Sequence, residues 1–165
     1  MFRCTSVMVR VEKACSFVMF HETKFKSVIR GHHGYKVRWT PVIGEKLTCK
    51  RDSREEAKAY DDFAVSLFKS PDSSGGSDVL VGHVPIELSH LVCTFLDAED
   101  SNEGRAEVIG KRTLENELVV PAVYTLRTKN KNISDVLVRE LQGIKEKVKY
   151  MDITIEKTVT KPVLS

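Results

Sequence analysis

The chain has 165 residues, of which 41% are hydrophobic and 30% are charged. This length suffices to bury one hydrophobic core but is short for two independent domains, so we expect one domain with extensions at its ends. Lysine and arginine number 26 against 23 aspartate and glutamate, a net charge of +3, so any surface that attracts a polyanion has to be local. The longest apolar stretches are far shorter than the roughly 20 residues of a membrane-spanning helix, which predicts no membrane span.

The N-terminal sequence and the cysteines indicate an intracellular protein. Residues 1–10 carry charge among their apolar side chains and have no small-residue cleavage site, unlike a secretory signal. The cysteines are widely scattered without a C-x-x-C pair, which predicts free, buried thiols rather than a disulfide framework: Cys4, Cys15, Cys49 and Cys93. We therefore expect an intracellular location.

The first part of the chain favours short strands. Apolar residues alternate with polar ones at Val7, Val9 and Val11, so residues 1–26 are predicted to be a strand-forming extension. From residue 27 a run of short strands and turns follows, with strands predicted over 26–30, 35–40 and 45–50.

The middle of the chain predicts a helical turn, a hairpin and a helix. The turn lies between residues 52 and 62, with Ser53 as its N-cap. Strands over 63–68 and 79–84 enclose a loop at Ser70–Ser77 that is rich in residues unsuited to packing. A helix is predicted to begin at Pro85, because apolar residues then follow the helical spacing i, i+3, i+4, i+7: Leu88, Leu91, Val92 and Phe95.

The last third of the chain predicts two further strands and a C-terminal appendage. Strands over 105–109 and 118–126 complete a small barrel over residues 27–128, and residues 129–165 form a helix, a strand and a tail. Ser134 is the predicted helix cap, and the helix carries an apolar stripe at Leu137, Leu141, Ile144 and Val148. That stripe either docks on the barrel, which we favour by about two to one, or binds a protein partner.

Catalytic and cofactor motifs are missing from the sequence. His32, His33 and His83 have no cysteine or carboxylate at metal-ligand spacing, and adjacent strand residues point to opposite faces. The glycines do not form a nucleotide-binding loop, and no G-x-S-x-G elbow is present. We expect no metal, no cofactor and no enzymatic activity.

A series of short motifs occurs in a fairly specific order between residues 28 and 128: Val28-Ile-Arg-Gly-His32, Val37-Arg-Trp-Thr40, Lys50-Arg-Asp52, Ala59-Tyr-Asp-Asp-Phe-Ala-Val65, Val81-Gly-His-Val-Pro-Ile-Glu-Leu88 and Val119-Val-Pro121. In this order they resemble the HIRAN domain, a module found fused to fork-remodelling helicases and in other contexts. The resemblance implies a mainly β fold with minor α, a modified OB-like small barrel with two short helices, here followed by a C-terminal helix. It also implies binding of single-stranded DNA at a free 3′ end.

The resemblance assigns a role to two adjacent residues. The ring of Tyr60 is implied to stack on the terminal base, and the carboxylate of Asp61 to accept a hydrogen bond from the sugar hydroxyl. Both side chains are expected to open onto one pocket whose floor is the backbone around Gly82 and His83.

Further residues are expected around this pocket. Trp39 occupies an aromatic position of the family, and Arg38 stands where helicase-fused members have an aromatic residue, so one stacking surface becomes a guanidinium plane. Either of them is expected on the wall opposite Tyr60. OB-type surfaces also follow the nucleic-acid backbone with cations, a role that suits Lys50 and Arg51.

The residues themselves leave alternatives open. Trp39 could be a core residue, as aromatics in small β domains usually are, and Asp61 could turn the chain before the strand at Phe63. Pro85 and Ile86 replace lysines that contact phosphate in the helicase-fused members. The alternative function is therefore a protein-interaction domain on a HIRAN-like barrel that has lost DNA-end binding, with the C-terminal helix as partner site.

Overall fold

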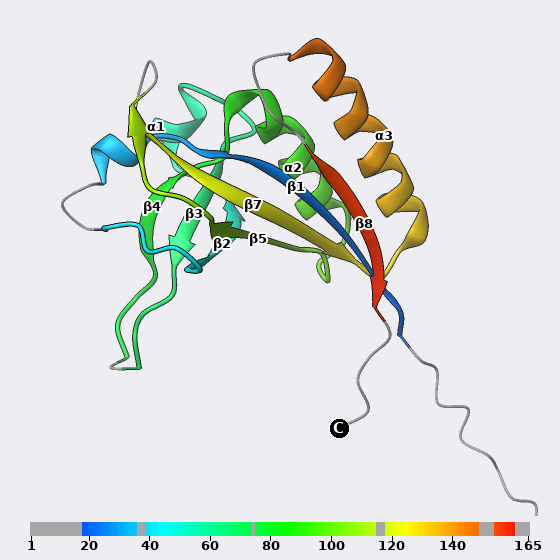
Figure 1. The fold of residues 1–165 in the computed structure, drawn as a ribbon, viewed down its shortest axis with the longest axis horizontal. Helices are drawn as coiled ribbons and strands as arrows, with labels where there is room; N and C mark the ends of the chain where they lie inside the picture. Colours follow the sequence, from blue (N-terminus) through cyan, green and yellow to red (C-terminus); the bar gives the residue numbers. More distant parts are fainter. Residues whose placement is uncertain (1–17, 36–38, 74, 115–117, 149–153, 161–165) are drawn as a thin grey trace, which may run out of the picture.

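The computed structural model describes residues 18–35, 39–73, 75–114, 118–148 and 154–160 as a curved antiparallel sheet with helices (Figure 1). The elements in chain order are β1 (Phe20–Ile29), the 3-10 turn η1 (His32–Gly34), β2 (Lys46–Arg51), α1 (Glu55–Lys58), β3 (Val65–Lys69), β4 (Val79–His83), α2 (Ile86–Ala98), β5 (Glu103–Val108), β6 (Thr113–Leu114), β7 (Leu118–Thr128), α3 (Lys131–Lys147) and β8 (Ile155–Thr160).

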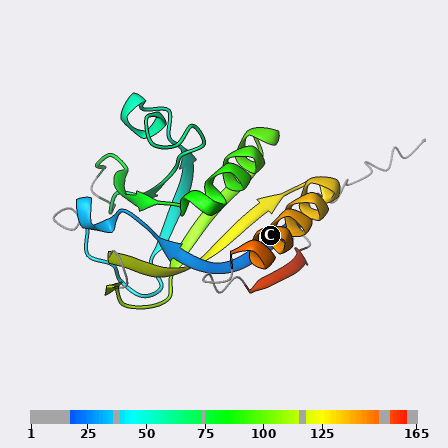
Figure 2. The same cartoon turned by 90° about the horizontal axis from the view of Figure 1, so that it is seen from above.

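In the described residues the strands follow the spatial order β4-β3-β2-β5-β7-β1-β8, and the short β6 pairs with β7. The long strand β7 is the centre of this sheet, because it pairs with β1 from Thr128 opposite His21 to Val120 opposite Ile29, and with β5 on its other side. Helices α2 and α3 pack against each other and against the sheet, and Figure 2 shows them side by side from above.

The end of β1 also meets β4, the strand at the far end of this order. Arg30 and His83 form a bridge in which Arg30 N donates to His83 O at 3.0 Å and His83 N donates to Arg30 O at 2.9 Å. A Cβ atom on Gly82 would lie 2.5 Å from Ile29 Cγ2 and 2.8 Å from Arg30 O, so only glycine permits this approach.

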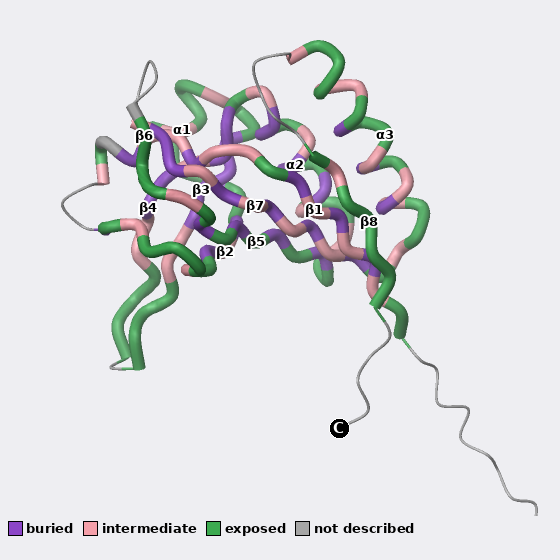
Figure 3. The backbone as a smooth tube through the Cα atoms, in the orientation of Figure 1, coloured by how far each residue is buried: buried purple, intermediate pink, exposed green. Residues whose placement is uncertain are grey.

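One hydrophobic core lies between the sheet and the helices (Figure 3). Inward-facing residues alternate with outward-facing ones along β7, as expected for a strand with one buried face. Phe25 of β1 and Tyr124 of β7 stack at the centre, with ring centroids 5.2 Å apart. The Tyr124 hydroxyl donates to Val28 O at 2.8 Å, which satisfies the polar group of a buried ring.

The predicted helix at Pro85 is confirmed. Its N-cap is Pro85, and Leu88, Val92 and Phe95 are buried against the core with Leu91 partly buried beside them. None of the helices in the described part of the chain is long and apolar enough to cross a membrane.

The C-terminal helix is part of the same core rather than an appendage. Leu137 and Leu141 of α3 are buried in the central cluster, and Ile144 packs against it, so the stripe docks on the sheet. A boundary at residue 26 is also wrong, because it falls inside the continuous strand β1. The apolar alternation at Val7, Val9 and Val11 lies outside the described residues.

Both predicted serine caps are wrong. Arg54 is the N-cap of α1 and makes no side-chain capping bond; instead the Asp52 carboxylate accepts from Arg54 N at 3.1 Å. Asn130 caps α3 by accepting from Asn132 N at 2.9 Å, and Ser134 is buried inside the helix. Asparagine is as good a cap as serine.

We expect α3 to be required for the stability of the whole domain. Leu141→Ala should lower the free energy of unfolding by about 2–5 kcal/mol, because it leaves a cavity in the shared core. Val136→Ala, on the exposed side of the same helix, should change it by less than about 0.5 kcal/mol. Urea unfolding followed by circular dichroism measures both values, and a single transition with equal, small effects would contradict a shared core.

Candidate functional site

A cleft of about 400 Å³ opens where the end of β1, α1, β3, β4 and the start of α2 meet. Its walls are formed by Arg30, Ala57, Tyr60, Asp61, Ala64, Val65, His83, Val84, Ile86 and Glu87. The structure thus brings the adjacent residues Tyr60 and Asp61 to the same cleft as His83 of β4, as predicted.

Tyr60 projects from the turn that ends α1. Tyr60 N and Asp61 N both donate to Ala57 O, so the chain turns sharply after a helix of a single turn. The Tyr60 residue is 89% exposed. The prediction that this ring lies open rather than in the core is confirmed, and its faces are accessible to a planar ligand.

Asp61 turns the chain before β3, which was one of its two predicted roles, and it also lines the cleft. Its Oδ1 accepts from Phe63 N at 2.9 Å, which turns the chain toward β3. Its Oδ2 accepts from the Ser89 hydroxyl of α2 at 2.5 Å, which fixes the carboxylate against the helix. An ionised carboxylate has about four acceptor positions, so these bonds leave capacity for a ligand hydroxyl.

Trp39 is not a wall of this cleft. It is 3% exposed, its indole N–H donates to Glu45 Oε2 at 2.7 Å, and the edge of its ring meets His32 at a centroid distance of 5.2 Å. The interpretation of Trp39 as a core residue is therefore confirmed. Arg38, the other residue expected on that wall, lies outside the described residues.

The predicted backbone cations are not at the cleft either. Lys50 pairs with Asp78 at 2.6 Å and Arg51 pairs with Asp97 at 2.5 Å, and neither lines the cleft. Gly82 does not line the cleft, but its lack of a side chain allows β4, with His83, to approach Arg30.

No role was assigned from the sequence to Arg30 and Glu87 of the cleft wall, and Ile86 was named only as the replacement of a lysine. Arg30 supplies the cation of this wall, Ile86 an exposed apolar surface and Glu87 a carboxylate. The signal available for Arg30 was its place inside the motif at residues 28–32, at the end of a predicted strand.

A chain of hydrogen-bonded side chains runs from the cleft into the protein. His83 Nε2 lies 3.1 Å from the Tyr35 hydroxyl, and His83 Nδ1 lies 3.1 Å from Ser66 Oγ. Ser66 Oγ donates to Asp52 Oδ2 at 2.5 Å. Arg54 closes the chain, donating from Nε and Nη2 to the two oxygens of Asp52 at 2.9 and 2.6 Å.

The contacts within this hydrogen-bonded network shift the pKa values of Asp52 and His83. The hydrogen bonds from Arg54 hold the pKa of the buried Asp52 carboxyl well below its usual range, against the effect of burial. Burial lowers the pKa of His83, while the charge of Asp52 opposes this effect. Among the described residues, no group of three or more His, Cys, Asp or Glu side chains is placed to hold a metal ion.

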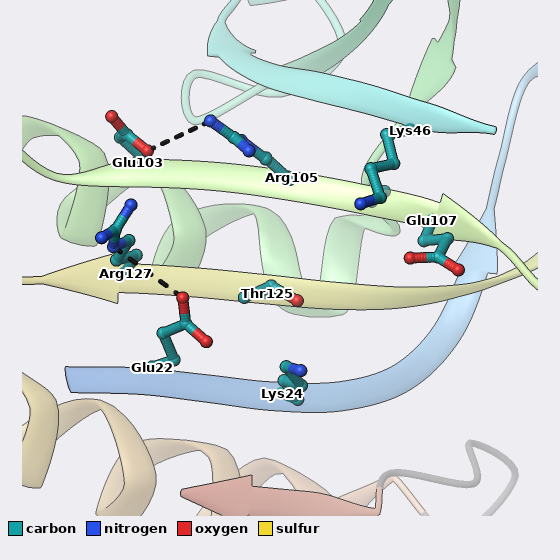
Figure 4. Close-up of a pocket in the computed structure, with 9 residues that line it drawn as sticks. Glu22, Lys24, Lys46, Glu103, Arg105, Glu107, Thr125 and Arg127 are labelled. Carbon is teal, nitrogen blue, oxygen red and sulfur yellow. Dashed lines mark hydrogen bonds and ion pairs between the residues drawn. The ribbon is translucent and has the colours of Figure 1, made fainter. Parts of the chain in front are cut away.

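A second hollow, of about 190 Å³, lies on the outer face of the sheet (Figure 4). Cations and carboxylates alternate across neighbouring strands there, as in the pairing of Arg127 of β7 with Glu22 of β1 at 3.8 Å. Lys46 lies opposite Glu107 in the register of β2 and β5. The opposite charges offset one another, so this face has the pattern of a solvated sheet surface rather than of an anion site.

Comparisons with family models, with curated proteins and with solved structures find no match to this chain. The assignment of function therefore depends on the geometry of the cleft.

Asp52→Asn should lower the free energy of unfolding by about 1–3 kcal/mol at neutral pH, because Arg54 and the buried Ser66 hydroxyl lose their charged acceptor. The folded-state pKa of Asp52 is depressed, so its stabilisation is present above the unfolded pKa of about 4 and is lost as the pH falls below it. Urea unfolding at several pH values should show that the difference in unfolding free energy between wild type and Asp52→Asn shrinks in acid. Asp62→Asn, at an exposed aspartate, is the matched control. A difference for Asp52→Asn that does not depend on pH would contradict the ionised, hydrogen-bonded state of Asp52.

Proposed function

We propose that this chain is a non-enzymatic nucleic-acid-binding module that holds single-stranded DNA, with its 3′ end, in the Tyr60 cleft. The observation that carries the proposal is the 89% exposed ring of Tyr60 at the rim of a cleft with an apolar floor. A large aromatic side chain in water gains nothing for the fold, whereas each base stacked on such a ring contributes about 1–3 kcal/mol to binding.

The polar groups of the cleft suit the rest of a terminal nucleotide. Arg30 is a donor for phosphate, and the carboxylate of Asp61, held by Ser89 and Phe63 N, is an acceptor for a terminal sugar hydroxyl. This division of roles matches what the HIRAN resemblance implies for Tyr60 and Asp61. The function implies an intracellular, nuclear location.

A HIRAN-type barrel is part of the same proposal. It is supported by the sheet order, which runs from β4 through β7 to β1, and by the backbone bonds between Arg30 and His83 that bring β4 against β1. The barrel would place the cleft at the seam between these strands. OB-type barrels bind single strands on surfaces of this kind.

Tyr60→Ala should weaken binding of a labelled oligothymidylate by about 5- to 150-fold, the loss of one base stack. Tyr60→Phe keeps the ring and should stay within about threefold of wild type. Fluorescence anisotropy measures the affinity, and the thermal midpoint should be unchanged because the side chain is exposed. Strands with a 3′-hydroxyl, strands with a 3′-phosphate and circular strands test end recognition in the same assay.

Three results would count against the proposal. Equal affinity of wild type and Tyr60→Ala would remove the stacking role. Equal binding of hydroxyl-ended and circular strands would remove end recognition but leave single-strand binding. Affinity that does not fall with added salt would exclude phosphate contacts of any kind.

A second candidate function is recognition of a protein segment at the same cleft, favoured by the side chain of Ile86. Ile86 begins α2, lines the cleft and is 62% exposed, so with Tyr60 it forms an apolar rim. Asp61 and Glu87 place carboxylates beside this rim, where a peptide amine or guanidinium would be favoured over a phosphate. The C-terminal helix is a weaker partner site than the sequence suggested, because its apolar stripe is largely covered by the sheet.

Ile86→Lys separates the two functions. A cation at this exposed position should strengthen oligothymidylate binding, about two- to tenfold, by adding one phosphate contact and steepening the salt dependence. It should instead weaken an apolar peptide ligand selected against the wild-type protein. Ile86→Gln, which removes the apolar side chain without adding charge, is the control. Weaker nucleic-acid binding by Ile86→Lys would favour the protein-interaction function.

A further inference from the structure

His83 stands at the junction of the cleft and the buried polar chain, and its contacts decide where its proton lies. Both ring nitrogens have partners, Tyr35 Oη at Nε2 and Ser66 Oγ at Nδ1. The ring therefore cannot flip freely, and each nitrogen must be a donor or an acceptor according to what its partner offers.

The direction in which each hydrogen bond of this network is donated follows from Asp52. Its carboxyl is kept ionised by Arg54, so it can only accept, and the single hydroxyl hydrogen of Ser66 is used at 2.5 Å on Asp52 Oδ2. Ser66 Oγ can then only accept from His83, which requires a hydrogen on Nδ1. In the neutral ring Nε2 is consequently bare and accepts from the Tyr35 hydroxyl.

A second proton can enter this arrangement without breaking its geometry. On protonation Nε2 becomes a donor and the Tyr35 hydroxyl becomes its acceptor, while the bond from Nδ1 to Ser66 is kept. The positive charge then lies on a residue that lines the cleft. Acidification therefore changes the charge of the cleft rather than its shape.

The surroundings of His83 include both signs of charge. From the elements packed against it, Asp52 after β2 favours the protonated ring, and Arg54 before α1 opposes it. Arg30 at the end of β1 adds a second opposing cation through its place in the same cleft, and Asp61 and Glu87 face the cleft with carboxylates. Tyr35 is the remaining titratable neighbour.

We propose that His83 is a pH-dependent anion sensor of the cleft, neutral as the Nδ1–H tautomer near neutral pH and cationic in mild acid, so that binding of a phosphate-bearing ligand strengthens on acidification. This inference rests on the proposed function, since it concerns the affinity of the same site. A bound phosphate near His83 stabilises the imidazolium, and by linkage the imidazolium strengthens the binding of the phosphate.

The working range follows from the direction of the shift. Burial lowers the pKa of His83 below its ordinary value of about 6.5, so the free cleft gains its charge only below that pH. The ligand raises the pKa again, which places the steepest change in affinity in mildly acidic solution.

The test is the affinity for a short oligothymidylate from about pH 8 to about pH 5, since thymine does not titrate in this range. Wild type should bind about three- to tenfold more tightly at the acidic end, the effect of one added charge at partial burial. His83→Asn should lose this rise while keeping the affinity near that at neutral pH. His90→Asn, at an exposed histidine outside the cleft, is the matched control and should keep it.

Two measurements keep the inference independent of the folding of His83→Asn. Tyr35→Phe removes the partner of Nε2, and the bond that the imidazolium donates to this hydroxyl is stronger than the bond that the neutral ring accepts from it, so the substitution should lower the pKa of His83 and move the rise in affinity to lower pH. Imidazole nitrogen shifts of the free wild-type protein should show the Nδ1–H tautomer near neutral pH and protonation below about 6.5.

The outcomes are distinguishable. Binding at every pH without a His83-dependent rise, while Tyr60→Ala still weakens it, overturns the sensor and leaves the proposed function. An Nε2–H tautomer in the free protein also overturns the sensor. No binding of oligothymidylate at any pH overturns both.

Discussion

The close approach of β4 to the end of β1 at Gly82 is the constraint on which the cleft depends. Because a Cβ atom there would collide with Ile29 Cγ2 and Arg30 O, the contact requires glycine, and through it Arg30 and His83 exchange their backbone hydrogen bonds. This bridge brings Arg30, at the end of β1, into the same cleft wall as His83 of β4. A larger residue at Gly82 would push Arg30 away from His83 and so separate two residues that line the cleft.

Much of the fold could be read from the sequence because its strands and its longest buried helix follow simple periodicities. The stripe of α2 is an example, since Leu88, Val92 and Phe95 have one face on which to be buried. The limits of the domain could not be read in this way. No local signal shows that β1 begins at Phe20, because its start depends on pairing with β7, about a hundred positions away. The apolar stripe of α3 favoured docking on the barrel, but it could not show that the helix belongs to the same core.

The part of the candidate site that could be predicted is the set of cleft residues named by the resemblance, Tyr60, Asp61 and His83. Tyr60 follows a single helical turn and is exposed by the local chain direction. Trp39, Lys50 and Arg51 do not line the cleft, and their side chains contact Glu45, Asp78 and Asp97 instead. The sequence around an aromatic or basic residue does not show whether its side chain contacts a ligand or another part of the fold.

The mixed charge of the cleft bears on how such a site would work. Arg30 is outweighed by the two carboxylates of Asp61 and Glu87, so the cleft exerts no long-range attraction on a polyanion, and ligand selection has to come from short-range contacts with the aromatic ring and the fixed carboxylate. Under these conditions one additional positive charge has a large relative effect, because it cancels the excess negative charge of the cleft. His83 is the described cleft residue whose unperturbed titration lies nearest neutral pH, and its second nitrogen is anchored through Ser66 to a buried, ionised Asp52. A weakly charged cleft with an anchored histidine is therefore better suited to conditional binding of a strand terminus than to permanent, high-affinity coating of nucleic acid.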